Sequence, residues 1–124
     1  MPLGSVAAMN ESLDNDYDGV DIEVALYLGN PAAGGVEINS TDCPGYTRYE
    51  SVSGEREAAA GGVKRLCVAE FTASAAWDDE PDYCQVFIGA DAWDFMPLDD
   101  FSVPGAGTVE KPVDVFHADA TEEA

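Results

Sequence analysis

Residues 19–30 read GVDIEVALYLGN, and this stretch decides the fold class. From Val20 to Leu28 the even positions carry Val, Ile, Val, Leu and Leu, whereas the odd positions carry smaller or more polar residues. Successive side chains of a strand point to opposite faces, so this stretch would have one apolar and one mixed face. We therefore expect a half-buried strand on which a β domain is built.

Further stretches have a two-residue period or a strand-like composition, and Gly and Pro residues separate them. They are residues 36–38, 46–52, 63–71, 83–88, 92–98 and 113–117. The stretch 63–71 is apolar on both sides, which favours a central strand. A short helix is expected over Leu3–Leu13, with Ser5 as its N-cap. The sequence thus predicts a mainly β fold, a β-sandwich or small barrel with a short N-terminal helix.

The length of 124 residues suits one domain with a real core. We expect a helix and acidic turn over residues 1–18, the β domain over 19–117 and an acidic tail over 118–124. Met1 to Leu13 lacks the basic start and apolar run of a signal peptide, so independent secretion is not expected.

Acidic residues dominate the charge: 25 Asp and Glu stand against 5 Lys and Arg, which gives a net charge of −20. This potential repels phosphate backbones and anionic lipid surfaces, so we expect no nucleic acid and no membrane as partner. The acids are interspersed with strand-forming apolar residues, which indicates that a folded domain carries the charge. A high-salt habitat explains this best, and an ordinary acidic protein is the alternative.

The sequence Asp14-Asn15-Asp16-Tyr17-Asp18-Gly19 resembles the first half of a calcium-binding loop. Asp14, Asp16 and Asp18 are therefore candidate metal ligands for weak binding of calcium or magnesium. The glutamate that completes such a loop is missing, because Ala25 lies eleven residues after Asp14. The alternative is a solvated acidic turn, with no cofactor.

Candidate chemistry is otherwise sparse. Cys43, Cys67 and Cys84 form no CxxC pair, so we expect buried free thiols; a site that joins them to His117, the single histidine, has no support from spacing. The chain has no GxSxG elbow, no Walker loop and no GxGxxG. We therefore expect that it is not an enzyme.

Large aromatic residues are the candidates for contacts between subunits, since Tyr and Trp dominate interface energetics. We place Tyr17, Tyr46, Tyr49, Trp77 and Trp93 in this group. Core packing is the alternative for each of them, and it is the favoured interpretation for Trp93, whose hairpin is expected to close the core.

The order of short motifs along the chain resembles the small β-rich virion proteins of tailed phages, described as minor capsid, decoration or tail-fibre proteins. The motifs are Val24-Ala25-Leu26-Tyr27-Leu28, Gly34-Gly35-Val36-Glu37, Gly45-Tyr46-Thr47-Arg48, Val68-Ala69-Glu70-Phe71, the Trp77 loop and Ile88-Gly89-Ala90-Asp91. The chain departs from the family in its extra acids, its cysteines and the Phe87-Ile88-Gly89-Ala90 sequence. With the acid excess, the resemblance implies a tailed virus of a haloarchaeon.

The resemblance implies a non-enzymatic virion protein that adds to the capsid, or to the tail, as a repeated homo-oligomeric unit, a trimer. Its partners would be viral capsid or tail proteins, and its location the virion. The alternative is a module that binds a host-surface glycan or a cation, for which Trp77-Asp78-Asp79 offers an aromatic platform beside carboxylates.

Stability is expected to rise steeply with salt concentration. Unpaired carboxylates repel one another more in the compact state than in the expanded chain, and salt screens that repulsion. Transfer from molar salt to about 10 mM, where the screening length is ~30 Å, should lower the melting temperature or unfold the protein. Lowering the pH toward the carboxylate pKa values should partly restore compactness. Equal melting temperatures in dilute buffer and molar salt would contradict the high-salt interpretation.

Overall fold

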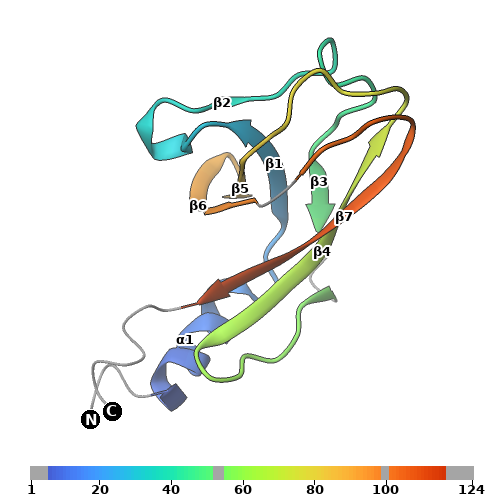
Figure 1. Ribbon diagram of the computed structural model, residues 1–124. Coiled ribbons are helices and arrows are strands. Elements are labelled where there is room, and N and C mark those ends of the chain that lie inside the picture. Colours follow the sequence, from blue (N-terminus) through green and yellow to red (C-terminus); the bar gives the residue numbers. More distant parts are fainter. Residues whose placement is uncertain (1–5, 52–54, 99–100, 117–124) are drawn as a thin grey trace. The chain divides into compact units, whose positions relative to one another are not determined.

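The computed structural model describes residues 6–51, 55–98 and 101–116 (Figure 1). The elements in chain order are α1 (Val6–Tyr17), β1 (Ile22–Leu28), the 3₁₀ turn η1 (Pro31–Ala33), β2 (Val36–Glu37), β3 (Tyr49–Ser51), β4 (Val63–Ala73), β5 (Tyr83–Ile88), β6 (Asp91–Pro97) and β7 (Gly107–Phe116). The chain is mainly β, with antiparallel pairing and one N-terminal helix, as expected of a β-sandwich or small barrel.

The chain divides into two compact units, which differ from the predicted division at residues 18 and 117. Unit 1 comprises Met1–Asp21, Ser51–Val68 and Pro112–Ala124, and unit 2 comprises Ile22–Glu50 and Ala69–Lys111. Strands β4 and β7 pair with each other along a two-stranded ribbon and contribute to both units (Figure 1). Pairing between segments so far apart in sequence is invisible to local patterns. The predicted tail, 118–124, lies outside the described residues.

Unit 2 contains the sheet founded on the predicted strand. Its order is β2-β1-β5-β6, and β3 also pairs with β1. The β1–β5 register runs from Ile22 opposite Ile88 to Tyr27 opposite Tyr83. The even positions of β1 from Ile22 to Leu26 are buried, so the period of two did predict the apolar face.

Four aromatic rings form a closed cluster in unit 2. Tyr46 stacks on Phe71 and Trp77 stacks on Phe101, both at centroid distances of 6.2 Å. Edge contacts of 6.0 Å between Tyr46 and Trp77, and of 6.3 Å between Phe71 and Phe101, complete the cycle. The indole Nε1 of Trp77 donates to the carbonyl of Pro44 at 2.9 Å, so the buried polar atom of this ring is satisfied.

The hydroxyl of Tyr46 fills a gap in the pairing of β1. The edge of β1 that does not face β5 pairs with β2 and β3. The Ile38 amide still donates to the Leu26 carbonyl at 3.0 Å, and the chain from Asn39 to Arg48 then leaves the ladder. At this gap the Leu26 amide donates to the Tyr46 hydroxyl at 3.0 Å, and the hydroxyl donates to Glu37 Oε2 at 2.7 Å. The predicted strand 46–52 is therefore wrong at its start: β3 begins at Tyr49, because Tyr46 serves β1 with its side chain instead of its backbone.

Strand β4 does not occupy the predicted central position. Among the described strands, β7 is the one with which it pairs, and Val68 and Glu70 are exposed. Burial also changes parity along the strand: Lys64 and Leu66 are buried in unit 1, whereas Ala69, Phe71 and Ala73 are buried in unit 2. The strand is apolar on both faces because its first half contributes side chains to the core of unit 1 and its second half, from the other face, to the core of unit 2.

Helix α1 supplies one side of the core of unit 1. Leu13 and Tyr17 are four residues apart, share one helix face and are both buried. Burial of this shared face explains why the helix continues to Tyr17, whereas the sequence analysis ended it at Leu13. The predicted first residues of the helix, including Ser5, lie outside the described residues. Asp14 and Asp16 consequently lie in the helix and not in a calcium-type loop.

A buried lysine holds the last turn of α1. Lys64 on β4 is 1% exposed, and its ammonium donates to Asp14 Oδ1 at 2.9 Å and to the carbonyl of Glu57 at 2.9 Å. Asp18 Oδ1 lies 2.7 Å from the same nitrogen. Acidic side chains at a helix C-terminus oppose the helix dipole, and α1 has no basic residue in its last turn. Lys64 provides the compensating positive charge from another element.

The contact between Lys64 and Asp14 shifts the pKa values of both residues. The hydrogen bond from Lys64 is the main reason that the pKa of Asp14 lies below its ordinary value of 3.8. Burial alone would lower the pKa of Lys64, but hydrogen bonds to Asp18 and Asp14 outweigh it and raise the pKa above 10.5. The contribution of Asp14 to stability is therefore lost as the pH falls through its lowered pKa. That of Lys64 is present below pH 10.5 and is lost as the pH rises through its raised pKa.

We expect Lys64→Met to lower the free energy of unfolding by about 2–4 kcal/mol at neutral pH, because three charge-assisted contacts disappear. Lys111→Met is the matched control: it removes the same charge from a partly exposed side chain that lies over the Phe101 ring at 5.6 Å. Denaturant unfolding between pH 3 and 11 measures both variants. Equal losses in the two variants would show that only net charge matters and that the Lys64 contacts do not.

Candidate interaction surface

The residues predicted for subunit contacts are mostly in the core. Tyr17 is 5% exposed, and Tyr46 and Trp77 are each 7% exposed, so the prediction that they form a contact surface is wrong for the chain as it folds here. Tyr49 is partly exposed at the start of β3. Composition alone could not make this distinction, because an aromatic side chain suits a core and an interface equally well.

Trp93 and Phe95 on β6 are the exposed aromatic residues instead. Their exposed fractions are 52% and 36%, although the sequence analysis placed Trp93 in the core. The physical reason is the position of β6 at the end of the strand order β2-β1-β5-β6. Asp91, Asp94 and Pro97 within the strand are typical of a sheet edge, and they were the available signal in the sequence.

A β-bulge accounts for the position of Trp93. Val86 lies opposite Asp94, whereas the next residue, Phe87, lies opposite Ala92. Trp93 is therefore the extra residue between two paired positions. Such a residue leaves the regular ladder and bends the strand locally.

Phe95 belongs to a sheet face that the register defines. It lies opposite Gln85, and its ring contacts that of Tyr83 at a centroid distance of 6.2 Å and an angle of 57°. Directly paired residues share a face, so Ala25 and Tyr27 of β1 belong to the same face. The face is thus aromatic at its β6 edge.

Arg48 covers the neighbouring part of this face. Its guanidinium lies 4.2 Å from the centre of the Phe87 ring. Nη2 donates to Glu37 Oε1 at 2.8 Å, Nε to Glu37 Oε2 at 2.9 Å and Nη1 to Glu23 Oε1 at 3.2 Å. Partial burial alone would raise the pKa of Glu37, but the hydrogen bonds from Arg48 and Tyr46 hold it below its usual value. The two carboxylates and the ring hold the cation in place.

A second exposed apolar group lies on β1 and β2, toward the edge of the sheet opposite to β6. Leu28 of β1 is paired with Val36 of β2, and their exposed fractions are 37% and 66%. Paired residues point to the same face, so the two side chains form one small apolar patch. Since β2 and β6 are the first and last strands of the order, unit 2 has exposed apolar side chains at both sides of its sheet.

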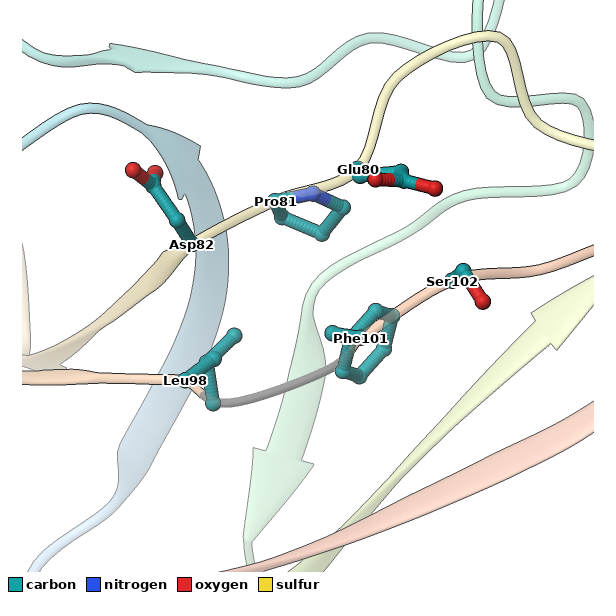
Figure 2. A pocket seen from close by; sticks show the side chains of 6 residues that line it. All are labelled: Glu80, Pro81, Asp82, Leu98, Phe101 and Ser102. Atoms are coloured by element: carbon teal, nitrogen blue, oxygen red, sulfur yellow. The ribbon is translucent and has the colours of Figure 1, made fainter.

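The loop before β5 borders a hollow of about 280 Å³. Its lining residues are Glu80, Pro81, Asp82, Leu98, Phe101 and Ser102 (Figure 2). Figure 2 shows the side chains of Glu80 and Asp82 directed away from each other. Asp82 Oδ1 accepts a hydrogen bond from the Gly29 amide at 2.7 Å, so one oxygen of this carboxylate already has a structural partner. The two carboxylates do not converge on a common ligand position.

The candidate metal ligands are brought together only in part. Asp14 and Asp18 meet at the Lys64 ammonium, and Asp16 does not take part in this contact. In the part of the chain that the structure describes, no group of three or more His, Cys, Asp or Glu residues is placed to hold a metal ion. The spacing of the three aspartates predicted a loop that would bring their carboxylates together. Asp14 and Asp16 lie in a helix instead, where they are not neighbours on one face.

The predicted glycan platform also lacks its central element, because the Trp77 ring is inside the aromatic cluster of unit 2. Asp78 is exposed beside it, and its amide donates to the carbonyl of Asp42 at 2.8 Å. A sugar ring stacks on an exposed aromatic face, which Trp77 does not offer. Trp77, Asp78 and Asp79 therefore do not form the glycan-binding platform that the sequence predicted.

The cysteines are free and buried, as the sequence analysis predicted for Cys43, Cys67 and Cys84. Burial is the main reason that the pKa of Cys67 rises to about 11. At neutral pH this thiol is protonated, and the thiolate is the reactive form. Among the described residues, no helix is long and apolar enough to cross a membrane.

Comparisons with known proteins identify no relative. Neither a scan against protein-family models nor a search of curated proteins found a match to this chain. A search of solved structures found none either.

Proposed function

We propose that this protein is a non-enzymatic structural protein of a tailed virus from a high-salt habitat. In this proposal it is a capsid decoration or minor capsid subunit, or less favoured, a tail appendage. Three features support the proposal: the motif order described above, the mainly β fold and the net charge of −20. Such a protein acts by attachment, and attachment requires exposed apolar area.

The exposed aromatic residues of β6 are the single observation that carries the proposal. A Trp side chain that is 52% exposed keeps much of its apolar area in water, and Phe95 at 36% adds to it on the same strand. Burial of apolar area contributes roughly 25 cal/mol per Å². The contact residues of the proposal are therefore Trp93 and Phe95, in place of the buried Tyr17, Tyr46 and Trp77.

The Leu28–Val36 patch offers a second contact area on the other side of the sheet. A repeated subunit on a shell needs one surface for its copies and another for the shell. We assign the Leu28–Val36 patch to contacts between copies and keep the trimer as the proposed oligomer. Light scattering in molar salt should then give three times the chain mass of 13.1 kDa.

Fractionation of virus particles tests the proposed function. Purified heads separated from tails should contain the protein at a fixed, integral ratio to the major shell protein, and salt washes that leave the shell intact should retain it. Its presence in tails alone would move it to the tail appendage. Its absence from both fractions, with the protein present in infected cells, would contradict the proposal.

A further inference from the structure

We infer that one face of the unit 2 sheet binds an uncharged glycan. This glycan face is defined by Tyr27 of β1 and by Tyr83 and Gln85 of β5. The inference goes beyond the proposed function, because it names a ligand of the subunit and not the shell to which the subunit attaches. The glycan face is also distinct from the Trp77 loop, whose ring is buried.

The strand register brings the three side chains together. Tyr27 lies directly opposite Tyr83, and Gln85 follows Tyr83 after one residue, so all three share one face of the sheet. Phe95 lies opposite Gln85 and flanks the glycan face on β6, where its ring contacts that of Tyr83 at 6.2 Å. A ring that its neighbours hold in place loses little conformational entropy when a ligand stacks on it.

The glycan face combines aromatic rings with uncharged hydrogen-bonding groups. Tyr27, Tyr83 and Gln85 are partly exposed, and in the part of the chain that the structure describes their side-chain polar atoms have no hydrogen-bond partner. A tyrosine hydroxyl and a glutamine amide can each donate and accept. The hydroxyl groups at the rim of a sugar ring do the same, and its C–H groups form an apolar face that stacks on an aromatic ring. The chemistry of the glycan face therefore matches that of a sugar.

The charge distribution favours an uncharged ligand. The register places Asp91 and Asp94 of β6 on the opposite face of the sheet. The carboxylates that pairing with β2 and β5 places on the same face as Tyr27 are Glu23 and Glu37, and Arg48 binds both of them. These paired carboxylates do not select a cation, and the net charge of −20 repels an anionic glycan.

An uncharged ligand also suits the proposed high-salt habitat. At ~1 M salt the screening length is ~3 Å, so exposed ion pairs lose most of their strength. Hydrogen bonds between neutral groups and contacts between C–H groups and rings do not depend on net charge. Burial of apolar area becomes more favourable when the salt is excluded from the protein surface. Binding through Tyr27, Tyr83 and Gln85 is therefore expected to persist in brine.

Two other occupants fit the glycan face less well. A second copy of the chain would bury about 800 Å² on each partner in a stable dimer, and aromatic side chains of about 150–250 Å² each that are mostly buried offer far less. Phe95, at 36%, is the most exposed of the three rings, since Tyr27 and Tyr83 are partly buried. An apolar protein surface would cover the two hydroxyls and the Gln85 amide without hydrogen bonds, which costs free energy.

The test uses the full chain and three hexasaccharides. Two are uncharged, one of N-acetylglucosamine and one of mannose, and the third is the mannuronic acid counterpart of the mannose chain. At least one uncharged hexasaccharide should bind with a dissociation constant of about 1 mM or lower in molar salt and should shift the NMR signals of the Gln85 side-chain amide. At about 0.15 M salt, the mannuronic acid chain should bind at least about fivefold more weakly than the uncharged chain that binds best.

Two variants locate the binding. Gln85→Leu removes the amide and Tyr83→Leu removes the ring, and each should weaken binding of that uncharged hexasaccharide at least about fivefold. Thr72→Val is the matched control, since it removes a hydrogen-bonding group from an exposed position of β4 and should leave the affinity unchanged. Thermal unfolding checks that each variant folds, and Gln85→Leu decides alone if Tyr83→Leu does not fold.

Three results would overturn the inference. The first is that neither uncharged hexasaccharide binds at about 10 mM. The second is unchanged affinity in a folded Gln85→Leu or Tyr83→Leu variant. The third is a shift of the Gln85 amide signals with protein concentration in the absence of sugar, because a second copy would then occupy the glycan face.

The failure of this inference and that of the proposed function can be told apart. Gln85→Leu leaves Trp93 and Phe95, the proposed shell contacts, unchanged. If virus heads contain the protein but neither uncharged hexasaccharide binds, the inference fails and the proposed function stands. If the hexasaccharide results are as expected but heads and tails lack the protein, the inference stands and the proposed function fails.

Discussion

The hydroxyl of Tyr46 is the contact on which unit 2 depends. It accepts the Leu26 amide, which lies beyond the last backbone bond between the β2 segment and β1, from Ile38 to the Leu26 carbonyl, and it donates to Glu37. Burial is the main reason that the pKa of Tyr46 lies far above 10, and the bond to Glu37 adds to the rise, so the group stays neutral. The Tyr46 side chain thereby links three parts of unit 2. Its hydroxyl binds β1 and Glu37, its ring belongs to the aromatic cluster, and Glu37 in turn binds Arg48.

The few cations of this acidic chain have structural positions. Lys64 closes the end of α1, Arg48 joins Glu23 and Glu37 over Phe87, and Arg65 binds Asp114 through Nε at 2.8 Å and Nη2 at 3.2 Å. With 25 acids and 5 bases, most carboxylates must rely on water and salt ions instead. Each basic residue therefore matters more here than in a charge-balanced protein, where surface ion pairs contribute little.

Sequence patterns predicted the features that depend on residues close together in the chain. The alternation over residues 19–30 identified β1 and its buried face, and the Gly89–Ala90 turn lies between β5 and β6 as the composition indicated. The patterns could not predict that β4 would pair with β7 and serve two cores, since that depends on contacts distant in sequence. They also could not separate buried Trp77 from exposed Trp93: the difference arises from the place of β6 in the strand order. Asp14 and Asp16 do not lie in a loop, because burial of Leu13 and Tyr17 on one helix face extends the helix to Tyr17.

The stability of Tyr46→Phe as a function of pH tests the central role of this hydroxyl most directly, with Tyr83→Phe, a partly exposed ring on β5, as control. At pH 7 in molar salt, Tyr46→Phe should lose about 1–3 kcal/mol of unfolding free energy, because the buried Leu26 amide loses its acceptor, and Tyr83→Phe should change by less than about 0.5 kcal/mol. Above pH 10 the unfolded wild type ionises Tyr46 and the folded form does not, so its stability should fall by up to about 1.4 kcal/mol per pH unit more steeply than that of Tyr46→Phe. Identical pH profiles and equal losses for the two variants would contradict the account.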